Sequence, residues 1–311
     1  MKGSDERALI ERFKQKDKRA LARILSIIEK KDIFSSELFE FIWKNIKGRK
    51  KLGITGLPGS GKSTLINCLI SAFRKQGKSV ACLLIDPSSP FSGGAVLGDR
   101  IRMQKHFTDP EVFIRSLASR GELGGICSTA VEMIFALDAF GADEIIIETV
   151  GVGQSEIEIA GVAETVVVVI TPEAGDAIQT LKAGLFEVGD IFVINKADRP
   201  GARALFEELK SAFAQERFER KVLLCSAQSG EGIDELVCAI GEQREAINNS
   251  IEERKSQLRK RYFIQLINLR QQRRLEETIK KDFAHLLERV GSGELTPKQA
   301  LLELEKALLL I

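Results

Sequence analysis

Residues 56–64 read Gly-Leu-Pro-Gly-Ser-Gly-Lys-Ser-Thr and match the pattern G-x-x-x-x-G-K-[ST]. The strand-like run 51–55 precedes them, and residues 65–70 continue at the spacing of a helix. Glycines in such a turn let backbone N–H groups curl around phosphate oxygens, and the following helix adds partial positive charge at its N-terminus. The pattern therefore predicts a nucleotide phosphate-binding loop. The alternative is a glycine-rich turn that binds nothing, which the matching flanks disfavour.

Each residue type in this loop has a chemical role. The ammonium group of Lys62 is expected to reach the β- and γ-phosphates, and the hydroxyl of Ser63 is expected to ligate Mg²⁺. The predicted nucleotide-binding residues of the loop are Gly56, Leu57, Pro58, Gly59, Ser60, Gly61, Lys62, Ser63 and Thr64.

Beyond the loop, short β-rich runs alternate with helical stretches. The runs cover residues 80–85, 112–114, 144–148, 165–170, 191–194 and 222–225. Such alternation predicts an α/β fold of the P-loop NTPase kind, with a mostly parallel central sheet flanked by helices. Ligands of such sheets bind outside the carboxyl ends of the strands, which is where the polar motifs of this chain lie.

Helical segments flank this region on both sides. Apolar residues recur at helical spacing between residues 6 and 46, and residues 242–289 contain neither glycine nor proline. Thr296 and Pro297 have the residue types of an N-cap and a first helical position. We therefore predict an N-terminal helical extension over 1–48, a P-loop domain over 49–241 and a C-terminal helical region over 242–311.

The N-K-x-D pattern at 195–198 indicates the base. The carboxylate of Asp198 can accept hydrogen bonds from N1–H and the exocyclic amine of guanine, whereas adenine has neither donor on that edge and would leave the carboxylate unpaired. Asn195 is expected to contact the O6/N7 side, and Lys196 to pack against the base or the loop. Ser226, Ala227 and Gln228 follow the last β-rich run, and a backbone N–H of this segment is expected to hold O6 of guanine.

Magnesium prefers hard oxygen ligands. Ser63 is one, and Glu148 stands where many GTPases have the aspartate of D-x-x-G. Asp86 and Asp99 are candidate additional ligands, direct or through water, although Asp99 could instead cap a helix. The cofactors expected are therefore GTP or GDP and Mg²⁺.

Catalysis is expected to be slow without help. Gly151 corresponds to the glycine of D-x-x-G, and Val152 follows it where Ras-like GTPases place a water-orienting glutamine. A partner or a second loop should therefore accelerate hydrolysis. Besides Lys62 and Glu148, the candidate catalytic residues come from polar loop positions, namely Arg102, Arg120, Gln179 and Lys182.

Composition limits the remaining function classes. The chain has 46 lysines and arginines against 44 acidic residues, so nothing in the net charge of +2 demands nucleic acid. No run has the length of a signal peptide or a membrane span, and we expect a cytoplasmic protein without a membrane partner. The five cysteines form no C-x-x-C pair and are expected to be reduced thiols, mostly in the core.

Several further strings resemble the MeaB/ArgK family of P-loop GTPases, which includes the methylmalonic aciduria type A protein. They are Asp-Pro-Ser-Ser at 86–89, Leu-Gly-Asp-Arg at 97–100, Arg-Gly at 120–121, Glu-Thr-Val-Gly-Val-Gly-Gln-Ser-Glu at 148–156, and Gly175-Asp176 with Gln179. The resemblance implies switch segments at 87–102, 148–156 and 171–182. The chain departs from the family pattern at Glu173, where glycine is expected after Pro172.

The resemblance also implies a function. Members act as GTP-hydrolysing chaperones of adenosylcobalamin-dependent acyl-CoA mutases such as methylmalonyl-CoA mutase, gating cofactor loading and protection, and they form homodimers partly through C-terminal helices. Residues 242–311 would then be a dimerisation region. Two alternatives are a metallochaperone GTPase, for which the chain offers only the distant His106 and His285, and a small-molecule kinase, against which N-K-x-D argues.

Overall fold

The computed structural model describes residues 3–30, 37–86, 103–118, 128–149, 159–173, 185–214, 220–246 and 251–308. The chain divides into two compact units, Met1–Leu258 and Arg259–Ile311. The boundaries expected at residues 48 and 241 stay predictions.

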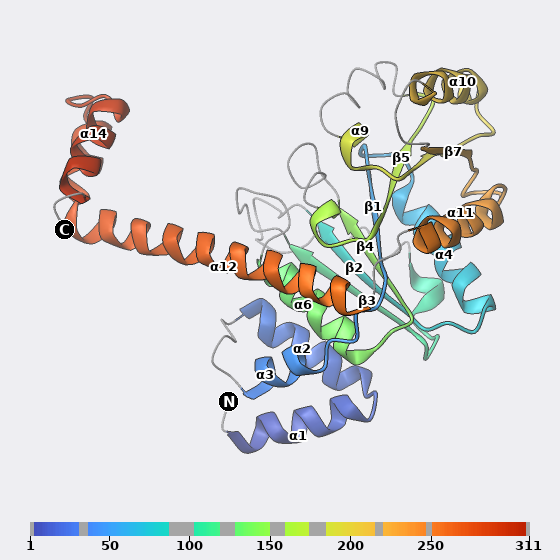
Figure 1. The fold of residues 1–311 in the computed structure, drawn as a ribbon, viewed down its shortest axis with the longest axis horizontal. Coiled ribbons are helices and arrows are strands. Elements are labelled where there is room, and N and C mark those ends of the chain that lie inside the picture. The colour runs from blue at the N-terminus through green and yellow to red at the C-terminus, as the bar shows by residue number, and fades with distance from the viewer. Residues whose placement is uncertain are drawn as a thin grey trace. The chain divides into compact units, whose positions relative to one another are not determined.

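The first unit is organised around a seven-stranded sheet with the order β3-β2-β4-β1-β5-β6-β7 (Figure 1). All of its strand pairs are parallel. The strands are β1 (Lys51–Gly56), β2 (Val80–Asp86), β3 (Val112–Ala118), β4 (Glu144–Thr149), β5 (Thr165–Ile170), β6 (Ile191–Ile194) and β7 (Lys221–Leu224). The predicted α/β fold is confirmed, and β3 is longer than its expected run.

Helices cover both faces of the sheet, which explains why its central strands are continuous apolar runs rather than alternating ones. Figure 1 shows α6 with the N-terminal helices on one face and α4 with α11 on the other. In the described part of this unit, the helices before α12 are α1 (Gly3–Lys14), α2 (Lys18–Lys30), α3 (Glu37–Lys44), α4 (Lys62–Lys75), η1 (Gln104–His106), α6 (Ser128–Phe140), η2 (Ile159–Gly161), α9 (Leu185–Val188), α10 (Ala202–Phe213) and α11 (Ile233–Ala246).

The N-terminal helices belong to the core of this unit. The apolar stripe of α2 is fully buried, and α2 and α3 pack against α6. Aromatic rings join these helices edge to face: the centroids of Phe13 and Phe140 are 5.2 Å apart, and those of Trp43 and Phe135 are 5.5 Å apart. These helices therefore pack on α6 and bury their apolar residues in the core of the unit.

The C-terminal helices follow the predicted pattern. A single helix, α12 (Ile251–Asp282), runs for 32 residues and is followed by α13 (Ala284–Gly291) and α14 (Pro297–Leu308). At the start of α14, the N–H of Thr296 donates to Oε1 of Gln299 and the N–H of Gln299 donates to Oγ1 of Thr296. This reciprocal capping box confirms the expected N-cap.

Two further sequence expectations can be compared with the described residues. None of their helices combines the length and apolar character needed to cross a membrane. Cys82 and Cys225 are buried free thiols, as expected, and Cys68 is half-buried, whereas Cys238 is exposed and its placement in the core is wrong. Cys127 lies outside the described residues.

Candidate functional site

The phosphate-binding loop joins the carboxyl end of β1 to the N-terminus of α4. Gly56, Gly59 and Gly61 all have positive φ, at 137°, 77° and 85°. A Cβ at Gly56 would lie 2.0 Å from the carbonyl oxygen of Val169, and one at Gly61 would lie 2.3 Å from Nδ2 of Asn195. Only glycine fits these two positions, and Gly61 leaves the first N–H groups of α4 without a side-chain cap.

Lys62 is buried and folds back over this loop. Its Nζ donates to the carbonyl oxygens of Gly56, at 2.8 Å, and Leu57, at 3.0 Å. Within the described part of the chain, the buried Oγ of Ser60 has no hydrogen-bond partner. A buried ammonium group, a hydroxyl without a partner and a helix N-terminus around one loop fit a phosphate group.

Two hard oxygen atoms meet beside the loop. The Oγ of Ser63 donates to Oε1 of Glu148 at 3.2 Å, and both side chains are buried. They come together because β4 lies next to β1, with Ile54 opposite Glu148. This donor set fits Mg²⁺.

Glu148 also acts on a neighbouring thiol. Burial raises the pKa of Cys82, and the negative charge of Glu148 adds to the shift, so this thiol is protonated.

The remaining predicted metal and catalytic residues are placed as follows. Asp86 is the last residue of β2, whose neighbour β4 ends at the same edge of the sheet, so its backbone lies on the side of the loop. Its side chain and the predicted residues Asp99, Arg102, Arg120, Gln179 and Lys182 lie outside the described part of the structure. Their roles stay predictions.

The predicted base-binding residues line one cavity of about 250 Å³. Three segments far apart in sequence contribute its lining: Gly61 and Thr64; Asn195, Lys196, Asp198 and Arg199; and residues 226–228. The hydroxyl of Ser226 donates to Oδ1 of Asp198 at 2.8 Å, which fixes the orientation of the carboxylate. A single carboxylate held in a small cavity is the arrangement that the N-K-x-D pattern predicts.

Asn195 has a structural role that the sequence pattern does not reveal. It is buried, its Nδ2 donates to the carbonyl oxygen of Ser60 at 2.8 Å, and its Oδ1 accepts from the N–H of Ala227 at 3.0 Å. The amide thus clamps the phosphate-binding loop to the loop after β7. Its predicted contact with the O6/N7 side of guanine stays a prediction.

Two residues of the site were missed by the sequence analysis. Arg199 lines the base cavity, and Glu173 pairs with both Arg199 and Lys196, the latter at 2.9 Å. The only sequence signal was the departure of Glu173 from the expected glycine. Lys196 itself has a φ of 58°, so its backbone holds a strained left-handed conformation at the cavity wall.

The fold and the site together define a P-loop nucleotide-binding protein with a carboxylate in its base cavity. Residues 21–281 match the family described as methylmalonyl-CoA mutase-associated GTPase MeaB. The chain belongs to this family, as the sequence strings indicated, and it is a GTPase that binds guanine nucleotide.

Individual relatives agree with this assignment. A protein of Pyrococcus abyssi is 43% identical over 302 residues, which cover 94% of this chain and 93% of that protein. The GTPase ArgK of Escherichia coli is 35% identical over 253 residues, or 78% of this chain and 76% of its own. Among solved structures, the crystal structure of LAO/AO transport system kinase aligns over 99% of both chains with a TM-score of 0.72 and 26% identity.

Proposed function

We propose that this protein is a GTP-hydrolysing chaperone of an adenosylcobalamin-dependent acyl-CoA mutase of the methylmalonyl-CoA mutase type, and that it gates the loading and protection of the mutase cofactor. The supporting observation is the extent of the family match. It begins in α2 and reaches the end of α12, so it includes the helices that surround the nucleotide-binding sheet. The aligned crystal structure carries the name of a kinase, but the carboxylate of Asp198 in the base cavity favours guanine over the adenine of ATP, which argues against the kinase alternative.

In the proposed site, different residues would bind the base, the phosphates and Mg²⁺. Guanine would occupy the 250 Å³ cavity with its N1–H and amine facing Asp198. The N–H groups of the loop and Lys62 would hold the phosphates, and Ser63 with Glu148 would hold Mg²⁺. When bound, Mg²⁺ supplies positive charge that stabilises the negative charge of the transferred phosphoryl group.

Rapid GTP hydrolysis at this site should require a partner protein. Position 152 is a valine, which cannot orient an attacking water through a hydrogen bond. The polar side chains of Arg102, Gln179 and Lys182 are proposed to complete the site when the mutase binds. Without the mutase, the protein would then hydrolyse GTP slowly.

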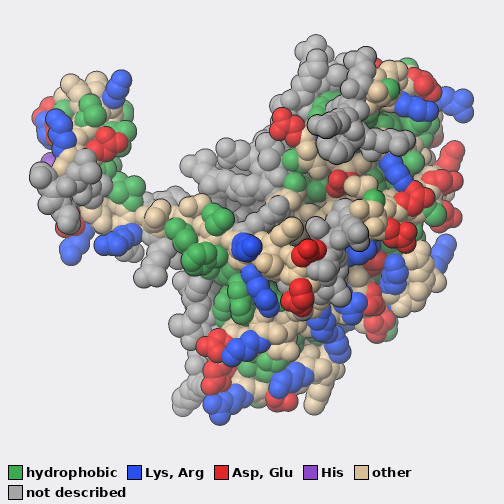
Figure 2. Space-filling model, viewed as in Figure 1, with side chains coloured by type: hydrophobic (Ala, Val, Ile, Leu, Met, Phe, Trp, Pro, Cys, Tyr) green, Lys and Arg blue, Asp and Glu red, His purple; other side chains and the backbone are tan. Residues whose placement is uncertain are grey.

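The dimer proposed for this protein is supported by the surface of its C-terminal unit. On α12, Phe263, Ile264 and Ile267 expose 62%, 57% and 39% of their surface. Figure 2 shows hydrophobic side chains exposed along this helix. A second copy of the chain would cover them, because large apolar side chains at helical spacing gain free energy when removed from water.

The test is GTP turnover by the purified full-length protein, alone and with the mutase of the same organism. We expect a low basal rate that the mutase raises roughly tenfold or more. Lys62→Ala, which lacks the phosphate-binding ammonium group, should show neither basal nor mutase-stimulated GTP turnover. An unchanged rate together with no complex in a binding assay would refute the chaperone role and leave the GTPase intact.

A further inference from the structure

A second cavity lies at the opposite edge of the sheet, where the parallel strands begin. It has a volume of about 540 Å³ and is formed by residues 47–50 before β1, Lys78 before β2, residues 143–144 at the start of β4, and the last turns of α11. We name it the amino-edge cavity. Because the phosphate-binding loop follows the carboxyl end of β1, this cavity is separate from the nucleotide site.

The charges that line the amino-edge cavity do not balance. Among the described residues that line it, five cationic side chains stand beside three carboxylates, those of Asp143, Glu144 and Glu245, an excess of two positive charges. The cationic residues are Lys47, Arg49, Lys50, Lys78 and Arg244. A cavity of this charge attracts an anion with two negative charges.

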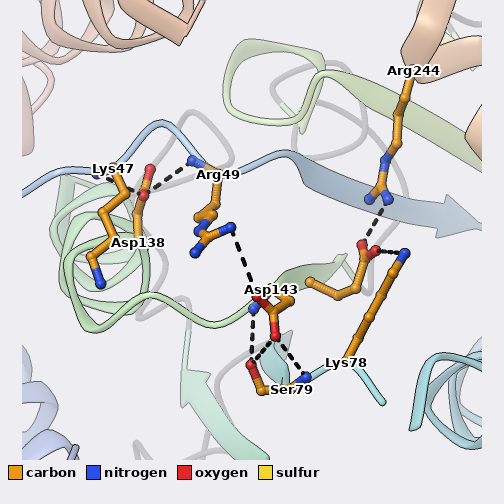
Figure 3. A network of polar contacts seen from close by, with 8 residues as sticks. Lys47, Arg49, Lys78, Ser79, Asp138, Asp143 and Arg244 are labelled. Atoms are coloured by element: carbon orange, nitrogen blue, oxygen red, sulfur yellow. Dashed lines mark hydrogen bonds and ion pairs between the residues drawn. The ribbon is translucent and has the colours of Figure 1, made fainter. Parts of the chain in front are cut away.

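Glu144 and Asp143 are already engaged by neighbouring donors, and Figure 3 shows Asp143 with Ser79 and Arg49. Glu144 accepts from Lys78 at 2.8 Å and from Arg244 at 2.7 Å. Asp143 accepts from the N–H and the hydroxyl of Ser79 at 3.0 and 2.7 Å, with Arg49 at 3.7 Å. They therefore offer little to the remaining N–H groups of the two arginines.

Buried N–H groups at this cavity lack an acceptor. The side chain of Arg244 is only 8% exposed, and among the described residues its Nε and Nη2 have no hydrogen-bond partner. The same holds for the buried Nε of Arg49. A buried donor without an acceptor destabilises the fold, and a bound oxyanion would remove that cost by accepting from the planar guanidinium edges.

The backbone is shaped to keep like charges together here. Asp138 accepts from the N–H groups of Lys47 and Arg49 at 3.0 and 3.2 Å, which fixes the cationic segment. A Cβ at Gly141 would lie 2.2 Å from Nζ of Lys47 and 2.9 Å from Nζ of Lys16. The φ of 85° at Gly141 favours glycine, and the ammonium groups of Lys47 and Lys16 both lie beside this residue.

Lys16 lies beside these cations, with its Nζ next to Gly141 as that of Lys47 is. Its pKa is lowered to about 8, first by burial and then by the neighbouring charges of Lys47 and Arg49, while Asp143 opposes the shift. The positive charge at the rim thus exceeds what the nearby carboxylate neutralises.

From these contacts we propose that the amino-edge cavity binds a small molecule that carries a phosphate group. A phosphate monoester dianion matches the excess of two charges, and its oxygens can accept from the arginine N–H groups that lack partners. The cavity volume lies in the range of sites for small organic ligands.

The experiment uses full-length Lys62→Ala protein, so that the phosphate-binding loop does not compete for the probe. Inorganic phosphate and ribose 5-phosphate are titrated by calorimetry. We expect both to bind, and to bind roughly tenfold or more weakly when Lys47→Ala and Arg49→Ala are added. The control is Lys44→Ala, an exposed lysine that pairs with Glu40 outside the cavity and should leave affinity unchanged.

The outcomes separate the possible ligands. Tighter binding of ribose 5-phosphate assigns the cavity to organic phosphates, and equal binding assigns it to free phosphate. No binding of either probe, or equal affinity in all variants, overturns the proposal. Lys47 is exposed and Arg49 half-exposed, so the result does not depend on substituting the buried Arg244, and circular dichroism checks the fold.

Proton uptake provides a second measurement. At about pH 8 Lys16 is half protonated, so an anion that raises its pKa should make the protein take up protons, detected as a heat that depends on the ionisation enthalpy of the buffer. Lys16→Gln should abolish the uptake. A network that serves only the fold would bind no anion and show no such heat.

Discussion

Single side chains decide how the loops of the nucleotide site meet. Asn195 belongs to the base-recognition pattern, yet in the structure its amide bridges Ser60 and Ala227. The contact is possible because Gly61 has no side chain in the space that Asn195 Nδ2 occupies. The two sequence motifs are therefore coupled through one buried amide.

Asn195→Ala should destabilise the protein and weaken nucleotide binding together. The substitution leaves a carbonyl oxygen and an N–H without their partner, at a cost of about 2 kcal/mol. We expect a lower thermal midpoint and a weaker GDP affinity, measured by calorimetry. Asn45→Ala is the matched control, because the exposed amide of Asn45 donates to the carbonyl oxygen of Phe41 in the preceding turn. Normal GDP affinity in Asn195→Ala would contradict the clamp.

Lys16 makes stability depend on pH. Its pKa is about 8 in the folded protein, because of burial and then the charges of Lys47 and Arg49, against an ordinary value of 10.5. Below about pH 8 Lys16 is charged in both states, and its charge destabilises the fold. Between the two values the unfolded chain binds the extra proton, so the free energy of unfolding rises with pH.

Lys16→Gln should therefore be the more stable protein at neutral pH, by less than about 1 kcal/mol because solvent screens the charge. The difference from the natural chain should close as pH rises through 10.5. Urea unfolding of both proteins across this range measures it, with Lys44→Gln as the exposed control. A difference that does not change with pH would exclude Lys16 as its source.

Elements are connected through charged contacts at the carboxyl edge of the sheet. Glu173, in the turn after β5, pairs with Lys196 and Arg199, which follow β6 and line the base cavity. Residues 174–184 follow directly in the chain. The ion pairs therefore link the start of that segment to the wall of the base cavity.

Glu173→Gln keeps the size of the side chain and removes its charge. We expect GDP to dissociate faster, by less than about fivefold, because the pairs are partly exposed and their main effect is to hold the cavity wall in place. Stopped-flow measurements should show the difference shrinking at high salt. Glu37→Gln, which removes an exposed pair with Arg7, is the control. Slower dissociation would mean that Glu173 draws Lys196 away from the base.

At the scale of the whole molecule, the C-terminal unit carries an exposed apolar surface. The second unit consists of the greater part of α12 with α13 and α14, and Phe263 and Ile264 on α12 are more than half exposed. A helix of this kind is stabilised mainly by packing an apolar face against a partner.

If the proposed dimer forms through this face, replacing both Phe263 and Ile264 with Asp should convert it into a monomer, since charges at an apolar interface cost several kcal/mol. Light scattering coupled to size exclusion measures the mass. Phe107→Asp is the control, because Phe107 is 55% exposed and lies in the first unit. An unchanged dimer would place the contact elsewhere, and GTP turnover of the variant would show whether assembly affects the site.

The sequence by itself determined the strands, the phosphate-binding loop and the base pattern. Each depends on neighbours within a few residues, through apolar runs, glycine spacing and side-chain chemistry. The same local patterns predicted the N-cap of α14 at Thr296. They failed for Cys238, whose exposure depends on which side of α11 faces the sheet.

Only the tertiary structure decided which motifs meet. The strand order places β4 beside β1, so Glu148 reaches Ser63, and places β5 beside β6, so the turn carrying Glu173 reaches the base loop. The amino-edge cavity joins four segments that are up to about two hundred residues apart. Such contacts between distant residues are set by the packing of the whole sheet, and no local pattern contains them.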